Sequence, residues 1–587
     1  MDVTKDNFKS ALSTFETHLK DARFVSIDVE MTGKPMVRKH AVFFALSIPI
    51  ILPLFFSFYF QLYYFIQNLL FSFLHLGLWL DERSKGFSFD SFQTKYEKIK
   101  LAAENFQIIQ VGVSLFEWIP NNSDSSDKDS ENSSSERACS LDHIDSSLPF
   151  KDISSKNKRK KRKILNSSRK QKHNIDKKTN SVSSSGYYET RVYNFFIYPA
   201  LKSGPFKKEK NFMLINSSVD FLTENAFDFN KWIYQGIPYL NFSDLEKLKK
   251  EKLSFITNPR LHARISDDSK DFYESTKLKI DGLANAPEQT EIFIDAENTY
   301  KMRLIHQIVD DIPCLYSVGQ PGSVKIIKTN QVTKKKLIEE YITKLEKDLE
   351  KHKGFSKVIE LLSECNKPII GHNCFTDFVY LYSHFCRPLP NTLAEFKNEI
   401  HNLFPEIYDT KFIFENSLCL KSIAVSSTLE DLNKSLKQSK GFDTSILLNA
   451  RSSKYTSDRF HEAGFDSFLT GKLFIKALPN LADSLNGFLN KLFMFKSFPS
   501  FVHITEADDE TNRPLAIELC SSQEINLKFV QDIVSEVCSQ DEYFIYTVSL
   551  NLCYVCTKIP SHDTINKIYL QLVKNGDKDW SVSQHDQ

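Results

Sequence analysis

The sequence has almost no net charge, because its 75 Lys and Arg residues are balanced by 74 Asp and Glu residues. Such a chain carries no overall field that attracts a polyanion, so any attraction of that kind has to be local. The 10 cysteines are scattered and do not form the regular frame of a disulfide-rich secreted protein. No secretory signal is found at the N-terminus. These absences lead us to expect a reducing compartment.

A second absence is local, because no Asp, Glu, Lys or Arg occurs between Ala41 and Leu80. By length this apolar stretch could supply two membrane spans of ~20 residues, or one long one. The apparent strands at 24–30 and 108–116 should lie in one sheet, and a single membrane crossing would separate them. We therefore interpret 36–80 as an anomalous apolar insertion, favouring extra translated sequence. A membrane-associating hairpin and a buried structural element stay open as alternatives.

Aromatic residues are nearly absent between Trp118 and Tyr187, where Ser, Asn and charged residues dominate. This composition predicts a disordered, charged insertion over 120–186. The basic cluster at 156–163 is typical of a nuclear localisation signal or a phosphate-binding arm, with a functionless solvated segment as the alternative. Residues 108–116 and 192–198 have the pattern of two antiparallel strands, so we expect the insertion at the tip of a hairpin.

Two acids stand one residue apart in the apolar stretch Phe24–Glu30, which predicts a strand. Side chains alternate along a strand, so Asp28 and Glu30 should point to the same face, about 6–7 Å apart. Two buried carboxylates repel each other and are desolvated, and a divalent cation such as Mg²⁺ offsets both effects. Taken alone, such a pair is more often not a metal site.

Two later motifs strengthen the metal interpretation. Residues 367–377 predict a short buried strand, a Gly-His-Asn turn and then a helix with Asp377 in its first turns. Near the end of the core, His461 precedes Asp466 by five residues, and Asp466 should open an amphipathic helix. The three motifs therefore supply four acids and one imidazole.

The order D-x-E, G-H-N-x₃-D and H-E-A-G-x-D resembles the DEDDh 3′-exonucleases, and in detail the poly(A)-specific ribonuclease family, the PARN-like deadenylases. Phe227–Lys231 and Gly236–Tyr239 also resemble that group, although we assign residues 218–240 a purely structural role. The resemblance implies an α/β fold: an RNase H-like DEDD exonuclease core, a small α/β insert domain and a C-terminal α+β domain of RRM-like type.

The resemblance also implies the chemistry of the site. Asp28, Glu30, Asp377 and Asp466 would hold two Mg²⁺ ions about 3.5–4 Å apart, with Mn²⁺ as a substitute. His461 would be the general base, since an imidazole titrates near neutrality.

Neighbouring polar residues are given supporting roles. His372 and Asn373 are interpreted as turn-forming residues or as partners of the metal ligands. Asp409 is a candidate fifth acid, but the resemblance implies a structural role, because the family places its Asp-Thr-Lys at a strand end near the site and not as a ligand.

Four parts are expected along the chain. Residues 1–240 would form the first part of the nuclease core and 354–480 its second part. The insert domain would cover 241–353 and the C-terminal domain 481–587. Relatives carry at the insert position a nucleic-acid-binding domain named for an Arg and a His, but Arg303 and His306 stand one residue too close for that signature.

The C-terminal residues have a β-α-β-α pattern, with the second strand at 544–558. Neither strand carries the basic-Gly-aromatic sequence that stacks RNA bases. We therefore expect a scaffold or a dimer contact here instead of an RNA reader.

The function predicted is Mg²⁺-dependent 3′–5′ exoribonuclease activity on RNA 3′ ends, with poly(A) tails favoured and 5′-mononucleotides as products. Trimming of small-RNA (piRNA-type) 3′ ends is the alternative, because residues 400–404 resemble that branch. A catalytically inert RNA-binding protein of the same fold is a second alternative. The expected partner is an RNA 3′ end, and a homodimer stays open. We expect the nucleus and cytoplasm, with a membrane only if 41–80 is a genuine segment.

Overall fold

The structure is a computed structural model that describes residues 1–33, 86–121, 186–199, 210–257, 263–288, 290–424, 426–438, 446–481 and 484–585. The predicted apolar insertion at 36–80 and the basic cluster at 156–163 lie outside the described residues, as does nearly all of the insertion predicted at 120–186. Within the described ranges, no helix combines the length and the apolar character that crossing a membrane requires.

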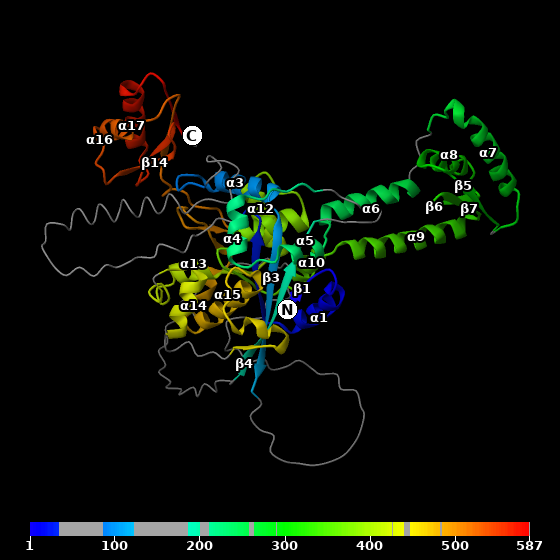
Figure 1. Ribbon diagram of the computed structural model, residues 1–587, viewed down its shortest axis with the longest axis horizontal. Coiled ribbons are helices and arrows are strands. Elements are labelled where there is room, and N and C mark those ends of the chain that lie inside the picture. Colours follow the sequence, from blue (N-terminus) through cyan, green and yellow to red (C-terminus); the bar gives the residue numbers. More distant parts are fainter. Residues whose placement is uncertain are drawn as a thin grey trace, which may run out of the picture.

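A 7-stranded mixed sheet forms the centre of the core (Figure 1). Its order is β1-β4-β3-β2-β8-β9, and β10 pairs with β4 as well. The strands are β1 (Asp2–Val3), β2 (Phe24–Met31), β3 (Ile108–Pro120), β4 (Gly186–Phe196), β8 (Ile369–Gly371), β9 (Ile407–Asp409) and β10 (Ile446–Leu448). Strands β2, β3 and β4 are antiparallel neighbours, whereas β8 and β9 continue the sheet parallel to β2. The predicted strands at 24–30, 108–116 and 192–198 are confirmed.

Alternate residues of β2 belong to two different hydrophobic clusters, one on each face of the sheet. Val25, Ile27 and Val29 pack into the first cluster, and Phe24 packs into the second. The first face is covered by α1 (Phe8–Asp21), α3 (Phe92–Asn105), α10 (Ser356–Glu364), α11 (Phe375–Leu381) and α12 (Leu393–Leu403), and the second by α13 (Thr410–Asn416), α14 (Leu429–Gln438) and α15 (Ala463–Ala477). The even-numbered residues of β2, Asp28 and Glu30 included, therefore share the face of α15.

Helix α15 differs from its prediction. The sequence predicts an amphipathic helix from Asp466, but α15 begins at Ala463 and is buried around almost its whole circumference. It packs on the sheet with one side and on α13 and α14 with the other, and only Lys472 and Lys476 are half-exposed. The amphipathic prediction is therefore wrong, because polar residues such as Ser467 and Thr470 are buried too.

Two short helices, α4 (Asn216–Glu224) and α5 (Phe229–Gln235), lie beside the end of β4. Leu222 of α4 and Trp232 of α5 are buried with Ile109 and Phe196 of the sheet. The Trp232 Nε1–H donates a hydrogen bond to the Ile197 carbonyl at 2.6 Å. This small cluster fixes α4 against the strand that carries Ile109.

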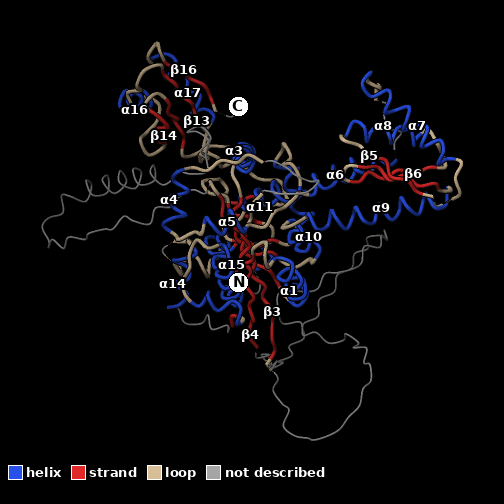
Figure 2. The backbone as a smooth tube through the Cα atoms, turned by 45° about the vertical axis from the view of Figure 1, so that its right-hand side comes forward, coloured by secondary structure: helices blue, strands red, loops and turns tan. Residues whose placement is uncertain are grey.

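A small α/β unit projects from the core on two long helices (Figures 1 and 2). Helices α6 (Phe242–Thr257) and α9 (Gln331–His352) pack on each other through Leu245, Leu345 and Leu349. The unit consists of α7 (Lys270–Ala284), β5 (Glu291–Asp295), α8 (Thr299–Asp310), β6 (Leu315–Gln320) and β7 (Ser323–Lys328), with the sheet order β5-β7-β6. The predicted insert domain, 241–353, covers these elements.

The C-terminal residues form a separate 4-stranded sheet with the order β14-β15-β13-β16. Its elements are β13 (Ala516–Ser521), α16 (Leu527–Ser535), β14 (Tyr543–Ser549), β15 (Leu552–Thr557), α17 (His562–Asn575) and β16 (Trp580–Gln584). The single strand expected at 544–558 is a hairpin, whose turn at 550–551 contains no Gly or Pro to mark it. The RRM-like assignment stays a prediction.

Residues 491–504 lie with the core, although the sequence assigned them to the C-terminal domain. Strands β11 (Lys491–Phe493) and β12 (Phe501–His503) form a hairpin beside β9. Leu492, Met494 and Val502 pack into the first cluster of the core. The core therefore extends past the predicted boundary at 480.

The C-terminal domain is joined to the core through the residues before α3. The rings of Phe87 and Phe89 stack 5.0 Å apart and lie 5.2 and 4.7 Å from the Tyr554 ring on the outer face of the C-terminal sheet. The carboxylate of Asp90 accepts hydrogen bonds from the Phe87 backbone N–H at 2.6 Å and from His585 Nε2 at 3.2 Å. We call Phe87, Phe89 and Asp90 the aromatic joint.

Replacing Phe87 and Phe89 together by Ala should release the C-terminal domain from the core. Each ring is about 1% exposed, and removing a buried Phe ring costs about 3–5 kcal/mol. Limited proteolysis should then cut between residues 505 and 515 on the order of ten times faster. Phe529→Ala, which removes a ring that is 41% exposed on α16, is the control. Equal cleavage rates in both variants would contradict this account of the joint.

Candidate active site

Helix α15 runs opposite to β2 along the face that carries the two acids. Near the C-terminal end of the helix, the Phe474 ring lies 5.5 Å from the Phe24 ring. Further along, the Ser26 hydroxyl donates a hydrogen bond to the Ser467 carbonyl at 2.6 Å. Asp28 and Glu30 follow Ser26 on the same face of β2, two and four residues further along. They therefore lie beside the first turn of α15, which carries Asp466.

Two glycines allow this close approach. A Cβ at Gly112 of β3 would lie 1.8 Å from the carbonyl oxygen of Ala463, at the start of α15. A Cβ at Gly471 would lie 2.2 Å from the Phe116 ring. Any larger residue at either position would push the helix, and Asp466 with it, away from the sheet.

Glu30, His461 and Asp466 come together at this end of the sheet. Each offers one ligand atom, and these atoms all lie within 4.8 Å of one another. Glu30 and Asp466 are buried, and His461 is half-buried. The backbone of His461 has a φ of 68°, and its N–H donates to Asp466 Oδ2 at 2.9 Å. The Asp466 carboxylate therefore also fixes the loop that carries the imidazole.

Asp28 and Asp377 are buried as well, but they do not belong to this 4.8 Å group. Asp28 lies on the same face of β2 as Glu30. Asp377 lies in the first turn of α11, which follows β8, the parallel neighbour of β2. All five residues predicted from the sequence thus stand at one end of the sheet, and the structure gathers three of them closely.

Asp409 holds the turn between β8 and α11. Its Oδ1 accepts the backbone N–H of Asn373 and of Lys411, each at 2.9 Å, and its Oδ2 accepts those of Cys374 at 3.1 Å and Phe493 at 3.0 Å. Burial raises the pKa of the Asp409 carboxyl, and these N–H donors oppose that rise. Asn373 has a φ of 57°, a left-handed conformation that needs such support. Asp409 therefore has the structural role expected of it.

Asp409→Asn should destabilise the protein. The substitution turns an acceptor oxygen into an NH₂ donor that faces backbone N–H groups, so buried donors lose their partner. We expect the free energy of unfolding in urea to fall by about 2–4 kcal/mol. Asp220→Asn, at an exposed position on α4, should stay within about 0.5 kcal/mol of the parent. A wild-type unfolding midpoint for Asp409→Asn would refute this role.

A charged network that the sequence did not reveal holds the residue after His461. The Glu462 carboxylate accepts the Tyr455 hydroxyl at 2.8 Å and forms an ion pair with Lys454. Lys454 Nζ also lies 2.6 Å from Asp2 Oδ1. Burial tends to raise the pKa of Asp2, but the positive charges of Lys454 and Lys231 outweigh burial and lower that pKa to about 2. Asp2 and Lys231 are far from Glu462 in sequence, so no spacing marks them as partners of this network.

The structure also brings an unexpected aromatic residue to the site. The ring centroid of Phe221 on α4 lies 4.8 Å from that of His461. The sequence interpretation gave residues 218–240 a purely structural role, since nothing in their composition requires chemistry. That interpretation omitted Phe221.

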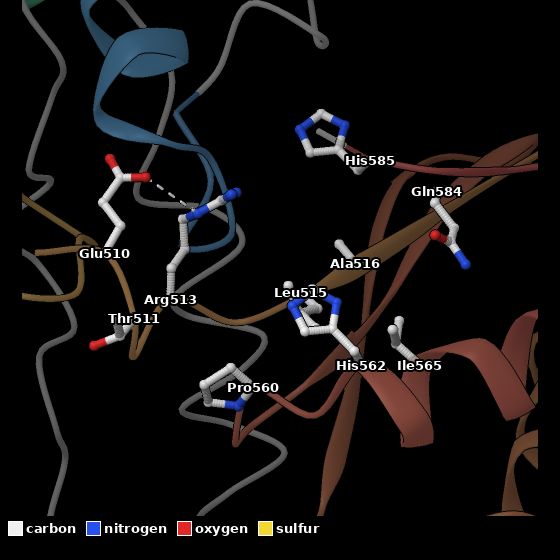
Figure 3. A pocket seen from close by; sticks show the side chains of 10 residues that line it. All are labelled: Glu510, Thr511, Arg513, Leu515, Ala516, Pro560, His562, Ile565, Gln584 and His585. Carbon is white, nitrogen blue, oxygen red and sulfur yellow. Dashed lines mark ion pairs between the residues drawn. The ribbon is translucent and has the colours of Figure 1, made fainter. Parts of the chain in front are cut away.

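A cavity of about 180 Å³ lies elsewhere, between the C-terminal domain and the segment that precedes it (Figure 3). Arg513 and Glu510 line it and form an ion pair at 3.4 Å. His585, which also lines it, contacts Asp90 of the aromatic joint. None of the five predicted site residues lines this cavity, so it is separate from the acidic cluster.

The residues at the acidic cluster fit a hard divalent cation. Carboxylate oxygens are the ligands that Mg²⁺ and Mn²⁺ prefer, and an imidazole is compatible with Mn²⁺. Buried carboxylates this close repel each other, and a cation relieves that repulsion. The arrangement of Glu30, His461 and Asp466 therefore suits a metal ion, with Asp28 beside them on β2.

Comparison with known proteins assigns the family. Residues 3–45 and 75–474 match the CAF1 family ribonuclease, which is well over half of the sequence. The chain belongs to the CAF1 ribonuclease family. The predicted RNase H-like α/β class of the core is thereby confirmed. The unmatched residues between the two segments fall inside the apolar insertion predicted at 36–80.

Individual relatives agree with this assignment. The poly(A)-specific ribonuclease PARN of Xenopus laevis is 28% identical over 338 residues, covering 53% of this chain and 52% of that protein. A pre-piRNA 3′-exonuclease trimmer of Bombyx mori is 28% identical over 331 residues, covering 52% of this chain and 62% of that protein. The chain thus spans about half the length of the PARN relatives that it matches.

Among solved structures, S. pombe Pop2p in its Mg²⁺- and Mn²⁺-bound form aligns with a TM-score of 0.32 and 12% identity. The alignment covers 84% of this chain and 98% of Pop2p. A TM-score of this size adds nothing to the family assignment.

Proposed function

We propose that this protein is a divalent-metal-dependent 3′–5′ exoribonuclease that shortens RNA 3′ ends, with poly(A) as its substrate. The observation that carries the proposal is the group of Glu30, His461 and Asp466 within 4.8 Å, at the end of the sheet where Asp28 and Asp377 also stand. Membership of the CAF1 ribonuclease family supports the reaction class. The similarity to a poly(A)-specific ribonuclease supports the substrate.

Each residue has a role in this reaction. Asp28, Glu30, Asp377 and Asp466 would hold two Mg²⁺ ions, with Mn²⁺ as a substitute. Divalent cations bound there supply Lewis-acid stabilisation of the negative charge that develops on the phosphate and on the leaving oxygen. His461 would accept the proton of the attacking water. The bond from phosphorus to the 3′-oxygen breaks, so the product is a 5′-mononucleotide and the shortened RNA keeps a 3′-hydroxyl.

Small-RNA trimming is the second candidate function. The Bombyx mori trimmer is as similar as the Xenopus laevis PARN, at 28% identity, and is matched over 62% of its own length against 52% for that PARN. A catalytically inert RNA-binding protein is the remaining alternative, and the predicted site residues argue against it because all five are present in the chain.

Location and assembly belong to the same proposal. We propose that the protein acts in the nucleus and cytoplasm, on the basis of the basic cluster at 156–163. Whether the protein forms a homodimer can be measured directly by light scattering. Membrane association would follow only from a genuine 41–80 segment, and sequencing the transcript across codons 30–90 tests that directly.

Asp28→Ala should abolish the release of AMP from 5′- and 3′-labelled oligo(A) in Mg²⁺. Losing one cation ligand should cost at least about 100-fold in rate, and EDTA should have the same effect on the parent protein. The thermal midpoint of the metal-free variant should not fall, because removing one of the neighbouring carboxylates relieves repulsion. Asp21→Ala, at the exposed end of α1, should keep full activity. Full activity of Asp28→Ala would contradict the assignment of the site.

Comparing two RNAs of equal length separates the two substrate candidates. A poly(A)-specific enzyme should shorten oligo(A) at least about tenfold faster than mixed-sequence RNA, a difference of roughly 1.4 kcal/mol in transition-state binding. A trimmer should process both at similar rates. Binding of both RNAs without shortening in Mg²⁺ would favour the inert alternative.

A further inference from the structure

Phe221 makes a ring contact with the imidazole proposed as the general base. The two ring centroids are 4.8 Å apart and the ring planes meet at 68°, an edge-to-face arrangement. This geometry is the favoured one for aromatic pairs, because the positive edge of one ring meets the negative face of the other. Phe221 thus contacts His461 directly and from a different part of the sequence.

Phe221 is itself held from outside the site. The next residue, Leu222, is buried with Ile109, Phe196 and Trp232, and this cluster fixes α4 against the sheet. The position of the Phe221 ring is therefore set by packing that does not involve the acids.

His461 needs such a contact because of where it lies. The loop before it is exposed over residues 456–459. Asp466 Oδ2 accepts the backbone N–H of His461, and this bond fixes the main chain at a φ of 68°. Fixing the main chain leaves the side-chain torsions of the imidazole to be set by what the ring contacts. Phe221 supplies a contact of that kind.

We propose that Phe221 is a positioning residue of the exonuclease, and that its ring holds the His461 imidazole in the orientation that accepts the proton of the attacking water. This inference rests on the proposed function, in which His461 is the general base. It gives residues 216–224 a part in the reaction, in addition to their structural role. The α4 helix then couples the packing of Leu222 to the placement of the base.

Phe221→Leu tests the proposal, because it removes the ring and keeps an apolar side chain of similar bulk. We expect kcat on oligo(A) to fall about three- to tenfold while KM changes by less than about twofold. Phe221→Tyr keeps the ring and should restore kcat. Phe529→Leu is the matched control, since its ring lies on α16 of the C-terminal domain and packs on Trp580, and it should leave kcat unchanged.

A double-mutant cycle distinguishes positioning from a general loss of structure. In a His461→Ala background, Phe221→Leu should cause no further fall in the single-turnover rate, because its effect passes through the imidazole. An equal fall in both backgrounds would overturn the proposal, as would an unchanged kcat in Phe221→Leu.

A measurement that does not depend on enzyme activity separates this inference from the proposed function. In the metal-free protein, the NMR signal of the His461 ring is assigned by its absence in His461→Ala. It should broaden in Phe221→Leu and stay sharp in Phe529→Leu. An unchanged signal in Phe221→Leu would overturn the positioning role even if the enzyme is active. If the wild-type protein is inactive but the His461 signal still broadens in Phe221→Leu, the ring contact stands and only the proposed function is refuted.

Discussion

The close packing of helix α15 against strands β2 and β3 determines the geometry of the candidate active site. The Ser26 hydroxyl bonds the Ser467 carbonyl, and Gly112 and Gly471 leave room for the helix and the sheet to touch. Because α15 runs opposite to β2, its first turn meets the end of the strand that carries Glu30. Asp466 and Glu30 therefore approach each other as a consequence of helix–sheet packing made by other residues.

Burying a carboxylate costs free energy, and the surrounding residues hold these carboxylates in place. Asp409 accepts the backbone N–H groups of Asn373 and Cys374 in the turn before Asp377. Glu462 ties the start of α15 to Tyr455 and Lys454. The sheet and these side-chain anchors thus restrict each acid to one position. Preorganised carboxylates of this kind favour a bound cation, because folding already holds them close together against their mutual repulsion and the ion relieves that repulsion.

Sequence patterns predicted most of the core but not the contacts that complete the site. Strand β2 and the alternation of Asp28 and Glu30 follow from period-two patterning, and the Gly-His-Asn turn before Asp377 follows from local signals. The burial of α15 on all sides was not predictable, because it depends on α13 and α14 packing over it. Phe221 and Asp2 act on the His461 loop from distant parts of the chain, and no local pattern reports such pairs. The hairpin of β14 and β15 was missed because its turn lacks Gly and Pro.

The most direct test of the account is a crystal structure of the protein soaked in Mn²⁺, with the anomalous signal used to locate the ion. The account predicts a peak at about 2.0–2.3 Å from carboxylate oxygens of both Glu30 and Asp466. A peak that lies away from these two residues, or fully ordered carboxylates without a peak at saturating Mn²⁺, would contradict it.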